Sequence, residues 1–374
     1  MSTPRLRARP LPRHSPGMKK ALIAMSGGVD SSVAAVLMQE LGYECAGLTL
    51  LLFNNEAVGF QAAGLPQGII DAKAAAALLG IPHHVLDFTE NFEKQVMQSF
   101  IRAYEQALTP NPCVVCNKHI KFNLAALKEG LQGKADFDCF ATGHYARTEY
   151  DSASGRYLLR KAADEKKDQS YVLYSLDQSR LERIRFPLGA LTKQEVRNLA
   201  KGKNLANAAK AESQDICFVP DGDYCSFIER RSGKSYPPGD ILDLEGRPIG
   251  RHRGIIRYTI GQRRGLGVAA NTPIYVAAKS AQANSVTLGP DSSLYSKALV
   301  AGDINLIACS KIERPMRVMV KTRYLQTAQA ATAEQTGDDS LHIEFDAPQR
   351  AITPGQAAVM YDGDIVIGGG TIAG

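Results

Sequence analysis

The chain has 374 residues, which is too long for one ordinary hydrophobic core and predicts two or three domains. Its composition, 44% hydrophobic and 22% charged, is that of an ordinary globular protein, and no apolar run approaches the roughly 18 residues of a membrane span, which excludes an integral membrane protein. A formal net charge of +6 permits an anionic partner without requiring one. Residues 1–17 carry four arginines, four prolines and no acid, so we expect a disordered tail there.

The first folded region, residues 18–219, alternates short apolar runs with helical stretches. The expected strands are LIAM, CAGLTLLLF, HHVLDF and CFATGH, and the expected helices cover residues 31–41 and 70–79, which stop at Gly42 and Gly80. Strands that alternate with helices form a parallel sheet covered by helices on both faces. The sequence therefore predicts an α/β domain whose ligands bind at the carboxyl ends of the strands.

Beyond Val219 the composition changes, because glycine and proline become frequent and helical periodicity disappears. The expected strands of this part are PIYVAA, SVTLG, MRVMVK, LHIEF and AAVMY. We therefore expect an all-β second half. It would consist of a small β-rich module over residues 220–288 and a C-terminal β-barrel over residues 289–374.

The strand LIAM ends at the loop Ser-Gly-Gly-Val-Asp-Ser-Ser, residues 26–32, which opens a helix. Amides at such a helix start bind anions, and Gly27 and Gly28 let the backbone close around a phosphate. The loop lacks the patterns of dinucleotide folds and Walker loops. It resembles the pyrophosphate (PP) loop of the ATP pyrophosphatases, which adenylate a carbonyl oxygen. Because Asp30 would repel phosphates unless a cation intervened, the sequence also implies Mg²⁺.

Seven cysteines, an odd number, with no signal peptide favour a reducing cytoplasm, where clustered thiols are catalytic or bind metals. Three interpretations stay open for Cys113, Cys116 and Cys217. A structural zinc site would need His119 or Cys225 as further ligands, at a spacing unlike that of usual zinc knuckles. An iron–sulfur cluster could be held by the three cysteines with one open position. In the third interpretation a thiolate attacks a persulfide and a second thiol resolves the disulfide.

Six motifs, taken together, carry a resemblance to a known family. They are TPNPCVVCNKHIKF (109–122), FATGHYAR (140–147), KDQSYVLY (167–174), ESQDICF (212–218), YTIGQRRGLG (258–267) and PGQAAVMYDGDIVIGGGTI (354–372). In these motifs and in their order, the chain from about residue 18 to its end resembles the bacterial tRNA-specific 2-thiouridylases. The resemblance implies a PP-loop adenylating domain followed by two β domains that bind tRNA.

The resemblance also implies roles for individual residues. Cys116 would be the nucleophile, and Cys217 would carry the persulfide. The ATP site would be lined by Ala24, Met25, Ser26, Gly27, Gly28, Val29, Asp30, Ser31, Leu50 and Gly143. The target base would meet Asn111, Pro112 and Cys113, and the rest of the tRNA would contact His144, Lys167, Asp168, Gln169, Arg323, Tyr324 and Gln356.

The implied reaction is ATP-dependent 2-thiolation of the wobble uridine of tRNA. Adenylation would turn the inert C2 oxygen into a leaving group that persulfide sulfur displaces. The implied cosubstrate is ATP with Mg²⁺, with no dedicated metal site in the protein, and the implied partners are tRNAs for Lys, Glu and Gln and a cysteine desulfurase or sulfur-relay protein. Residues 247–264, with six arginines and no acid, would contact the RNA backbone.

Three alternatives remain beside this interpretation. The first is a tRNA thiolase that depends on a [4Fe-4S] cluster held by Cys113, Cys116 and Cys217. The second is a PP-loop ligase that adenylates a small substrate, in which the cysteines would be idle. The third is a non-catalytic tRNA- or ribosome-binding factor, against which the intact loop and the cysteine pair argue.

Overall fold

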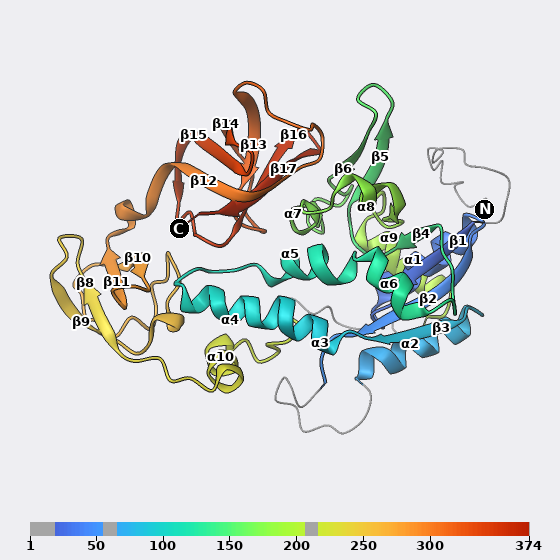
Figure 1. Ribbon diagram of the computed structural model, residues 1–374, viewed down its shortest axis with the longest axis horizontal. Coiled ribbons are helices and arrows are strands. Elements are labelled where there is room, and N and C mark those ends of the chain that lie inside the picture. The colour runs from blue at the N-terminus through green and yellow to red at the C-terminus, as the bar shows by residue number, and fades with distance from the viewer. Residues whose placement is uncertain (1–18, 55–65, 206–215, 374) are drawn as a thin grey trace.

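The computed structural model describes residues 19–54, 66–205 and 216–373 (Figure 1). The tail expected over residues 1–17 lies outside these ranges. Within them, no helix combines the length and the apolar character needed to cross a membrane. The described strands form three sheets, which Figure 1 shows as a parallel sheet near the N-terminal label, a small yellow and orange sheet, and an orange to red barrel.

Five of the described strands form the parallel sheet, in the order β3-β2-β1-β4-β7. They are β1 (Lys20–Ala24), β2 (Glu44–Leu51), β3 (His83–Asp87), β4 (Cys139–Ala141) and β7 (Ile184–Arg185). Leu22 and Ile23 of β1 point to opposite faces and are both 0% exposed, as expected for a sheet covered on both sides. The strand order reverses between β1 and β4, and ligands of open α/β sheets bind beyond the strand ends at such a point.

The two expected helices are present, and both begin earlier than predicted. α1 (Val29–Glu40) starts directly after Gly28, and α2 (Gln67–Leu78) starts directly after Pro66. Both end one residue earlier than predicted, next to Gly42 (φ +83°) and Gly80 (φ +65°), which adopt the left-handed conformation that stops a helix. The remaining α-helices of this part include α6 (Leu124–Leu131), α7 (Ser170–Leu173), α8 (Gln178–Arg183) and α9 (Lys193–Gly202).

Two helical segments run from the parallel sheet toward the other two bodies (Figure 1). The first consists of α3 (Thr89–Phe92), the π-helical η2 (Glu93–Met97) and α4 (Gln98–Glu105), which follow one another without a break. The second consists of α5 (Pro112–Cys116) and the π-helical η3 (Asn117–Lys121). Since π-helical turns are frequent at functional sites, η3 directs attention to the cysteines of α5.

The prediction of an all-β second half was wrong at one point, because this part also contains a helix. Residues 224–232 form α10 (Tyr224–Ser232), whose N-cap Asp223 accepts a hydrogen bond from the Ser226 amide at 3.0 Å. The helix buries Cys225, Phe227 and Ile228. A helix of nine residues is too short for its periodicity to stand out between glycine- and proline-rich stretches.

The strands expected beyond residue 219 are present. The small sheet has the order β10-β11-β8-β9 and contains β8 (Gly239–Leu242), β9 (Pro248–His252), β10 (Tyr275–Ser280) and β11 (Ser285–Gly289). The barrel consists of β12 (Tyr295–Leu306), β13 (Met316–Lys321), β14 (Gln329–Gly337), β15 (Ser340–Arg350), β16 (Ala357–Asp362) and β17 (Ile365–Ile372). Pairing of β12 with β17 closes the barrel. The predicted fold class is confirmed, while the exact domain boundaries stay predictions.

The barrel is joined to the first domain by a shared sheet. The hairpin of β5 (Arg147–Asp151) and β6 (Arg156–Arg160) extends the barrel sheet, because Arg160 pairs with Ile365 of β17. Asp364 then forms ion pairs with Arg147 and Arg160, each at 2.7 Å. The first domain therefore contributes strands to the sheet of the C-terminal one.

A second contact joins the barrel to the segment that precedes α5. The Thr109 amide donates to Pro354 O at 2.9 Å, and Gln356 Nε2 donates to Thr109 O at 2.8 Å. A Cβ atom at Gly355 would lie 3.0 Å from the Thr109 nitrogen, so the two backbones approach as closely as glycine permits. The barrel thus fixes the start of the segment that carries Cys113 and Cys116.

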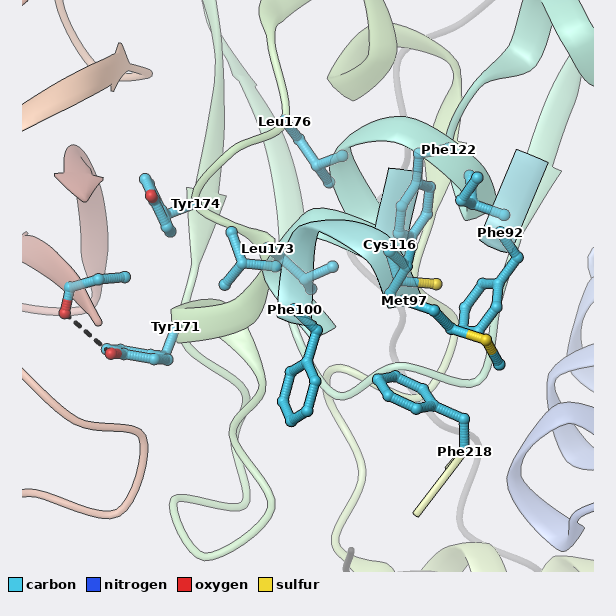
Figure 2. Packing of buried hydrophobic residues seen from close by; sticks show 14 of the residues in the cluster. Phe92, Met97, Phe100, Cys116, Phe122, Tyr171, Leu173, Tyr174, Leu176 and Phe218 are labelled. Carbon is cyan, nitrogen blue, oxygen red and sulfur yellow. Dashed lines mark hydrogen bonds between the residues drawn. The ribbon is translucent and has the colours of Figure 1, made fainter. Parts of the chain in front are cut away.

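An aromatic cluster holds α3, α4 and α10 around Phe218 (Figure 2). The Phe218 ring lies 5.6 Å from that of Phe92, 5.3 Å from that of Phe100 and 5.1 Å from that of Phe227. Phe218 and Phe227 are each only 1% exposed. Because Phe218 is the neighbour of Cys217 in sequence, this cluster also positions that cysteine.

We expect Phe218→Ala to lower the free energy of unfolding by about 3–5 kcal/mol, since it empties a tightly packed aromatic site. It should also speed alkylation of Cys217 in the folded protein. Phe227→Ala is the matched control, with a similar loss of stability and unchanged Cys217 alkylation. Denaturant titration and peptide mass spectrometry measure the two effects. Equal Cys217 alkylation rates in the two variants would show that Phe218 does not position that residue.

Candidate active site

The predicted PP loop follows β1 and is held by its own serines. The Ser26 amide donates to Ser31 Oγ at 3.2 Å, and Ser31 Oγ donates to Gly28 O at 3.0 Å. Gly27 has φ +75°, and a Cβ atom there would lie only 2.3 Å from Gly68 O. At Gly28 the nearest atom to such a Cβ is Ser26 Oγ at 3.5 Å, so there is free space beside the Gly28 backbone. The loop and the helix start together form a cradle of phosphate-binding type.

The other predicted ATP residues surround the ends of β1, β2 and β4. Ala24 ends β1 and the buried Met25 follows it, while Leu50 lies near the end of β2. Gly143 follows β4, and a Cβ atom there would lie 2.7 Å from the Asp30 carbonyl carbon. The fold therefore brings the loop and Gly143 together at the reversal of strand order, where a nucleotide is expected.

Asp30 is already bound by groups of the protein. Lys193 Nζ lies 2.7 Å from Asp30 Oδ1 and 2.8 Å from Asp30 Oδ2, and the Tyr145 hydroxyl donates to Oδ1 at 2.9 Å. The inference of Mg²⁺ from an uncompensated Asp30 is therefore wrong in its premise. In the described part of the chain, no group of three or more His, Cys, Asp or Glu side chains is arranged to hold a metal ion.

The segment that carries the predicted nucleophile is a short helix with a well-formed start. Asn111 is the N-cap of α5 and accepts from the Cys113 amide at 3.1 Å and the Val114 amide at 3.4 Å. Pro112 occupies the first turn, where its missing N–H has no cost. Cys113 is exposed, whereas Cys116 is 6% exposed. Figure 2 shows the Cys116 side chain among Met97, Phe122 and Phe218.

The fold brings Cys113, Cys116 and Cys217 into one electrostatic neighbourhood, and all three are free thiols. Burial raises the pKa of the Cys116 thiol, while the ammonium group of Lys121 acts in the opposite direction. Burial likewise raises the pKa of Cys217 to about 12, again opposed by Lys121. Cys217 nevertheless keeps an exposed surface, so a reagent can reach it although protein atoms desolvate its sulfur.

Lys121 is a site residue that sequence reasoning missed. Burial lowers its pKa, but the negative charges of Cys116, Cys113 and Cys217 together outweigh burial and raise it. It is thus a cation close to all three thiols. The signal in the sequence was its place five residues after Cys116, but only the π-helical geometry of η3 turns that spacing toward the thiol.

We expect Lys121→Met to slow alkylation of Cys217 by about tenfold between pH 8 and 10, because loss of the ammonium group raises the thiol pKa and lowers the thiolate fraction. The rate should still increase with pH in both proteins, since the thiolate is the reactive form. Iodoacetamide labelling followed by peptide mass spectrometry measures it. Lys128→Met, an exposed lysine of α6, should leave the rate unchanged. Equal rates in all three proteins would contradict this role of Lys121.

His144 lies on the same side of the sheet as the thiol group. Its Nδ1 is 2.8 Å from Thr142 Oγ1, and its ring lies 5.7 Å from that of Phe122 and 6.2 Å from that of Phe186. Burial, with a smaller contribution from the charge of Lys121, lowers the pKa of His144 to about 3. The imidazole is therefore neutral at physiological pH and presents an aromatic, uncharged surface to the site.

Several predicted tRNA contacts make internal hydrogen bonds. Asp168 is 8% exposed and accepts from the Ala162 amide and the Ser170 hydroxyl, at 3.0 and 2.7 Å. Three further side chains bond to the backbone of other segments: Gln169 to Tyr145, Arg323 to Ala351, and Gln356 to Thr109. These four residues shape the surface, whereas Lys167 and Tyr324 retain exposed or half-exposed side chains. Their roles toward tRNA stay predictions.

The arginine-rich segment is less free than its composition indicates. Arg247 pairs with Asp243 at 2.7 Å, Arg251 with Asp240 at 3.6 Å, and Arg257 with Glu229 at 2.5 Å. Of the six arginines in residues 247–264, three are exposed and form no ion pair with a described residue: Arg253, Arg263 and Arg264. Arg263 borders a hollow of about 650 Å³ lined by residues 265–274. The positive charge that residues 247–264 can offer to an anion is therefore carried by these three side chains.

Family models match the three bodies of the structure. Residues 19–221 match the "tRNA methyl transferase HUP domain", residues 225–290 the "tRNA methyl transferase PRC-barrel domain", and residues 296–372 the "Aminomethyltransferase beta-barrel domain". The parallel sheet with its anion-binding loop, followed by a small β module and a closed barrel, thus defines a HUP-domain protein of the tRNA-modifying class.

Curated relatives identify the family within this class. A tRNA-specific 2-thiouridylase MnmA of Carboxydothermus hydrogenoformans is 46% identical over 95% of this chain and 98% of its own length. Another from Acetivibrio thermocellus is 45% identical over 95% of this chain and 99% of its own length. The chain belongs to the family of tRNA-specific 2-thiouridylases. A solved NMN synthetase from Francisella tularensis is 18% identical over 59% of this chain and 79% of that one, with a TM-score of 0.32, too low to carry an argument.

Proposed function

We propose that this protein transfers sulfur to C2 of the wobble uridine of tRNA at the expense of ATP, giving 2-thiouridine, AMP and pyrophosphate. The observation that carries the proposal is the presence of a glycine loop at a helix start and of three free thiols in one domain of a chain whose relatives, matched over almost their whole length, are tRNA-specific 2-thiouridylases. Methyl transfer, which the family-model descriptions mention, would give no role to either feature.

In the first step, ATP binds with its phosphates in the loop of residues 26–31. The C2 oxygen of uridine attacks the α-phosphorus, the bond to the β-phosphate breaks, and pyrophosphate leaves. The uridine then carries AMP on a carbon that a nucleophile can attack. Mg²⁺ would enter on the ATP phosphates, since Asp30 is engaged by Lys193. No step assigned to the protein depends on a metal site of its own.

In the second step, Cys217 carries a persulfide received from a donor protein such as a cysteine desulfurase or a sulfur-relay protein. The terminal sulfur attacks C2 and AMP leaves with its electron pair. Cys116 then attacks Cys217 Sγ, which releases the thiouridine and leaves a Cys116–Cys217 disulfide. Alternatively, Cys116 attacks first and frees hydrosulfide as the nucleophile. In both routes a reductant reopens the disulfide, so the catalyst requires a reducing cytoplasm.

The tRNA end of the site would be built from surfaces already described. A wobble uridine lies in a single-stranded loop and can leave its stack at a cost of a few kcal/mol. The exposed start of α5, with Cys113, and the neutral ring of His144 would meet the base, and the exposed arginines would bind the backbone. We propose the anticodon stem-loops of tRNAs for Lys, Glu and Gln as substrates.

The cluster-dependent route remains the main alternative, with Cys113, Cys116 and Cys217 as ligands of a [4Fe-4S] cluster. The exposure of Cys113 and Cys217 would leave such a cluster accessible. We favour the persulfide route because it gives the neighbouring thiols of Cys217 and Cys116 the two roles of sulfur carrier and resolving thiol.

The experiment is nucleoside mass spectrometry of unmodified tRNA incubated with anaerobically purified protein, ATP, Mg²⁺ and a persulfide donor. We expect wobble 2-thiouridine only when ATP is present, with one pyrophosphate released for each thiouridine. Thiouridine formation that requires reconstituted iron and sulfide would instead support the cluster route. Pyrophosphate release with a small substrate and without tRNA would support a ligase.

A further inference from the structure

Lys193 forms an ion pair that neither the motifs nor the family comparison single out. Its ammonium group lies 2.7 and 2.8 Å from the two oxygens of Asp30, a residue of the first turn of α1. The Lys193 side chain is 9% exposed and that of Asp30 is 27% exposed. The Tyr145 hydroxyl completes the site by donating to Asp30 at 2.9 Å. The pair therefore lies at the base of the phosphate-binding loop.

The placement of Lys193 is unfavourable by local rules. It is the first residue of α9, where the helix dipole disfavours a positive charge, and it is almost completely buried. Two nearby acidic groups offset this, because the Lys193 amide donates to Asp164 at 2.9 Å while its side chain holds Asp30. The Tyr145 ring lies 5.7 Å from the ammonium group. Such a departure from local rules is expected at a functional site.

The function of Lys193 follows from its position beside the loop of residues 26–31. An anion held by the amides of residues 27–31 would lie beside the Asp30 carboxylate, and two negative charges a few ångströms apart in a partly buried site repel each other strongly. The ammonium group of Lys193 cancels the carboxylate charge before the nucleotide arrives. The helix start can then act as a net positive site.

We propose that Lys193 is a positioning residue for the nucleotide, which neutralises Asp30 so that the loop can accept the triphosphate of ATP. This inference rests on the proposed use of ATP. It adds a residue of α9, outside the loop, to the nucleotide site.

A second ion pair between the same two helices offers a matched control. Lys203, just after α9, lies 2.9 Å from Glu40 of α1, and both side chains are about half exposed, at 46% and 49%. This pair ties α9 to α1 as Lys193 does, but far from the loop end of α1. If Lys193 served only to hold the helices together, Lys193→Met and Lys203→Met would change the free energy of unfolding. Both would leave the Kd of ATP unchanged.

The test measures the Kd of ATP by calorimetry, with Mg²⁺, for the full-length protein and four variants. Lys193→Met should weaken ATP binding by about tenfold or more, because the negative charge of Asp30 is left without its partner cation. Lys193→Met/Asp30→Asn should restore the Kd to within about threefold, since the charge is removed together with its partner. Lys193→Arg should bind almost as the parent protein does, and Lys203→Met should be indistinguishable from it.

The double variant keeps the test valid if Lys193→Met folds poorly, because it leaves no buried unpaired charge. The inference is overturned if the double variant binds ATP as weakly as Lys193→Met, or if Lys193→Met folds and binds like the parent. Failure of the parent protein to bind ATP would overturn the proposed function itself. The parent protein thus tests the proposed function, and the variants test the role of Lys193.

Discussion

Cys217→Ala is expected to abolish wobble-uridine thiolation, by at least a thousandfold, while pyrophosphate release on tRNA continues. In the proposed route Cys217 carries the sulfur but takes no part in adenylation, which occurs at the PP loop. Loss of the covalent sulfur carrier removes one step completely, as loss of a catalytic nucleophile does in other enzymes. Thiouridine is measured by nucleoside mass spectrometry and pyrophosphate by a coupled assay on the same sample.

Two further variants make the result specific. Cys225→Ala removes a buried thiol of α10, which is not part of the proposed route, and should retain full activity. Cys116→Ala should also abolish turnover but should allow persulfide to accumulate on Cys217, because the resolving thiolate is missing. If inorganic sulfide restores thiolation to Cys217→Ala, this residue is a carrier. If sulfide fails and bound iron disappears as well, Cys217 is a cluster ligand and the persulfide route is wrong.

The adjacent glycines of the loop should respond in opposite ways to the same substitution. Gly27→Ala should lower the free energy of unfolding by about 2–3 kcal/mol, because its positive φ strains an L-residue and its Cβ would meet the backbone oxygen of Gly68 at 2.3 Å. Gly28→Ala should leave stability almost unchanged, since its φ is −87° and its nearest neighbour is 3.5 Å away. It should nevertheless weaken ATP binding strongly, since the methyl group fills the phosphate cradle.

Chemical denaturation and ATP calorimetry on both variants separate the two effects. Gly133→Ala is a control for a positive-φ glycine away from the loop, with φ +77° and no atom within 4 Å of the added Cβ. It should lose a little stability and no ATP affinity. Unchanged ATP affinity in Gly28→Ala would mean that phosphate does not occupy this cradle.

The parts of the molecule that short sequence strings specify were predictable. The loop of residues 26–32 and the pair Cys113 and Cys116 could be found because their neighbours in sequence are also their neighbours in space. The parallel sheet followed from the alternation of strands and helices, and the barrel from its alternating short runs. The nine-residue helix α10 escaped because its packing against the aromatic cluster, and not its own periodicity, stabilises it.

Groups that meet only through the tertiary fold could not be predicted. Lys193 lies 163 residues from Asp30, and no local pattern pairs the two. Mg²⁺ was inferred from Asp30 because a sequence displays the charge of a side chain but not its partner. In the same way, the hydrogen bond of Gln356 to Thr109 appears only when the barrel is packed against the first domain.

The hairpin of β5 and β6 limits how this family can recombine. Its two strands precede the barrel by more than a hundred residues in sequence, yet β6 pairs with the start of β17, and Arg147 and Arg160 bind Asp364. A chimera cut between the family-model regions would pair one parent's hairpin with the other parent's β17. Barrels exchanged between relatives should therefore fold well only when the hairpin is exchanged with them. The two segments that must be exchanged together are not adjacent in the gene.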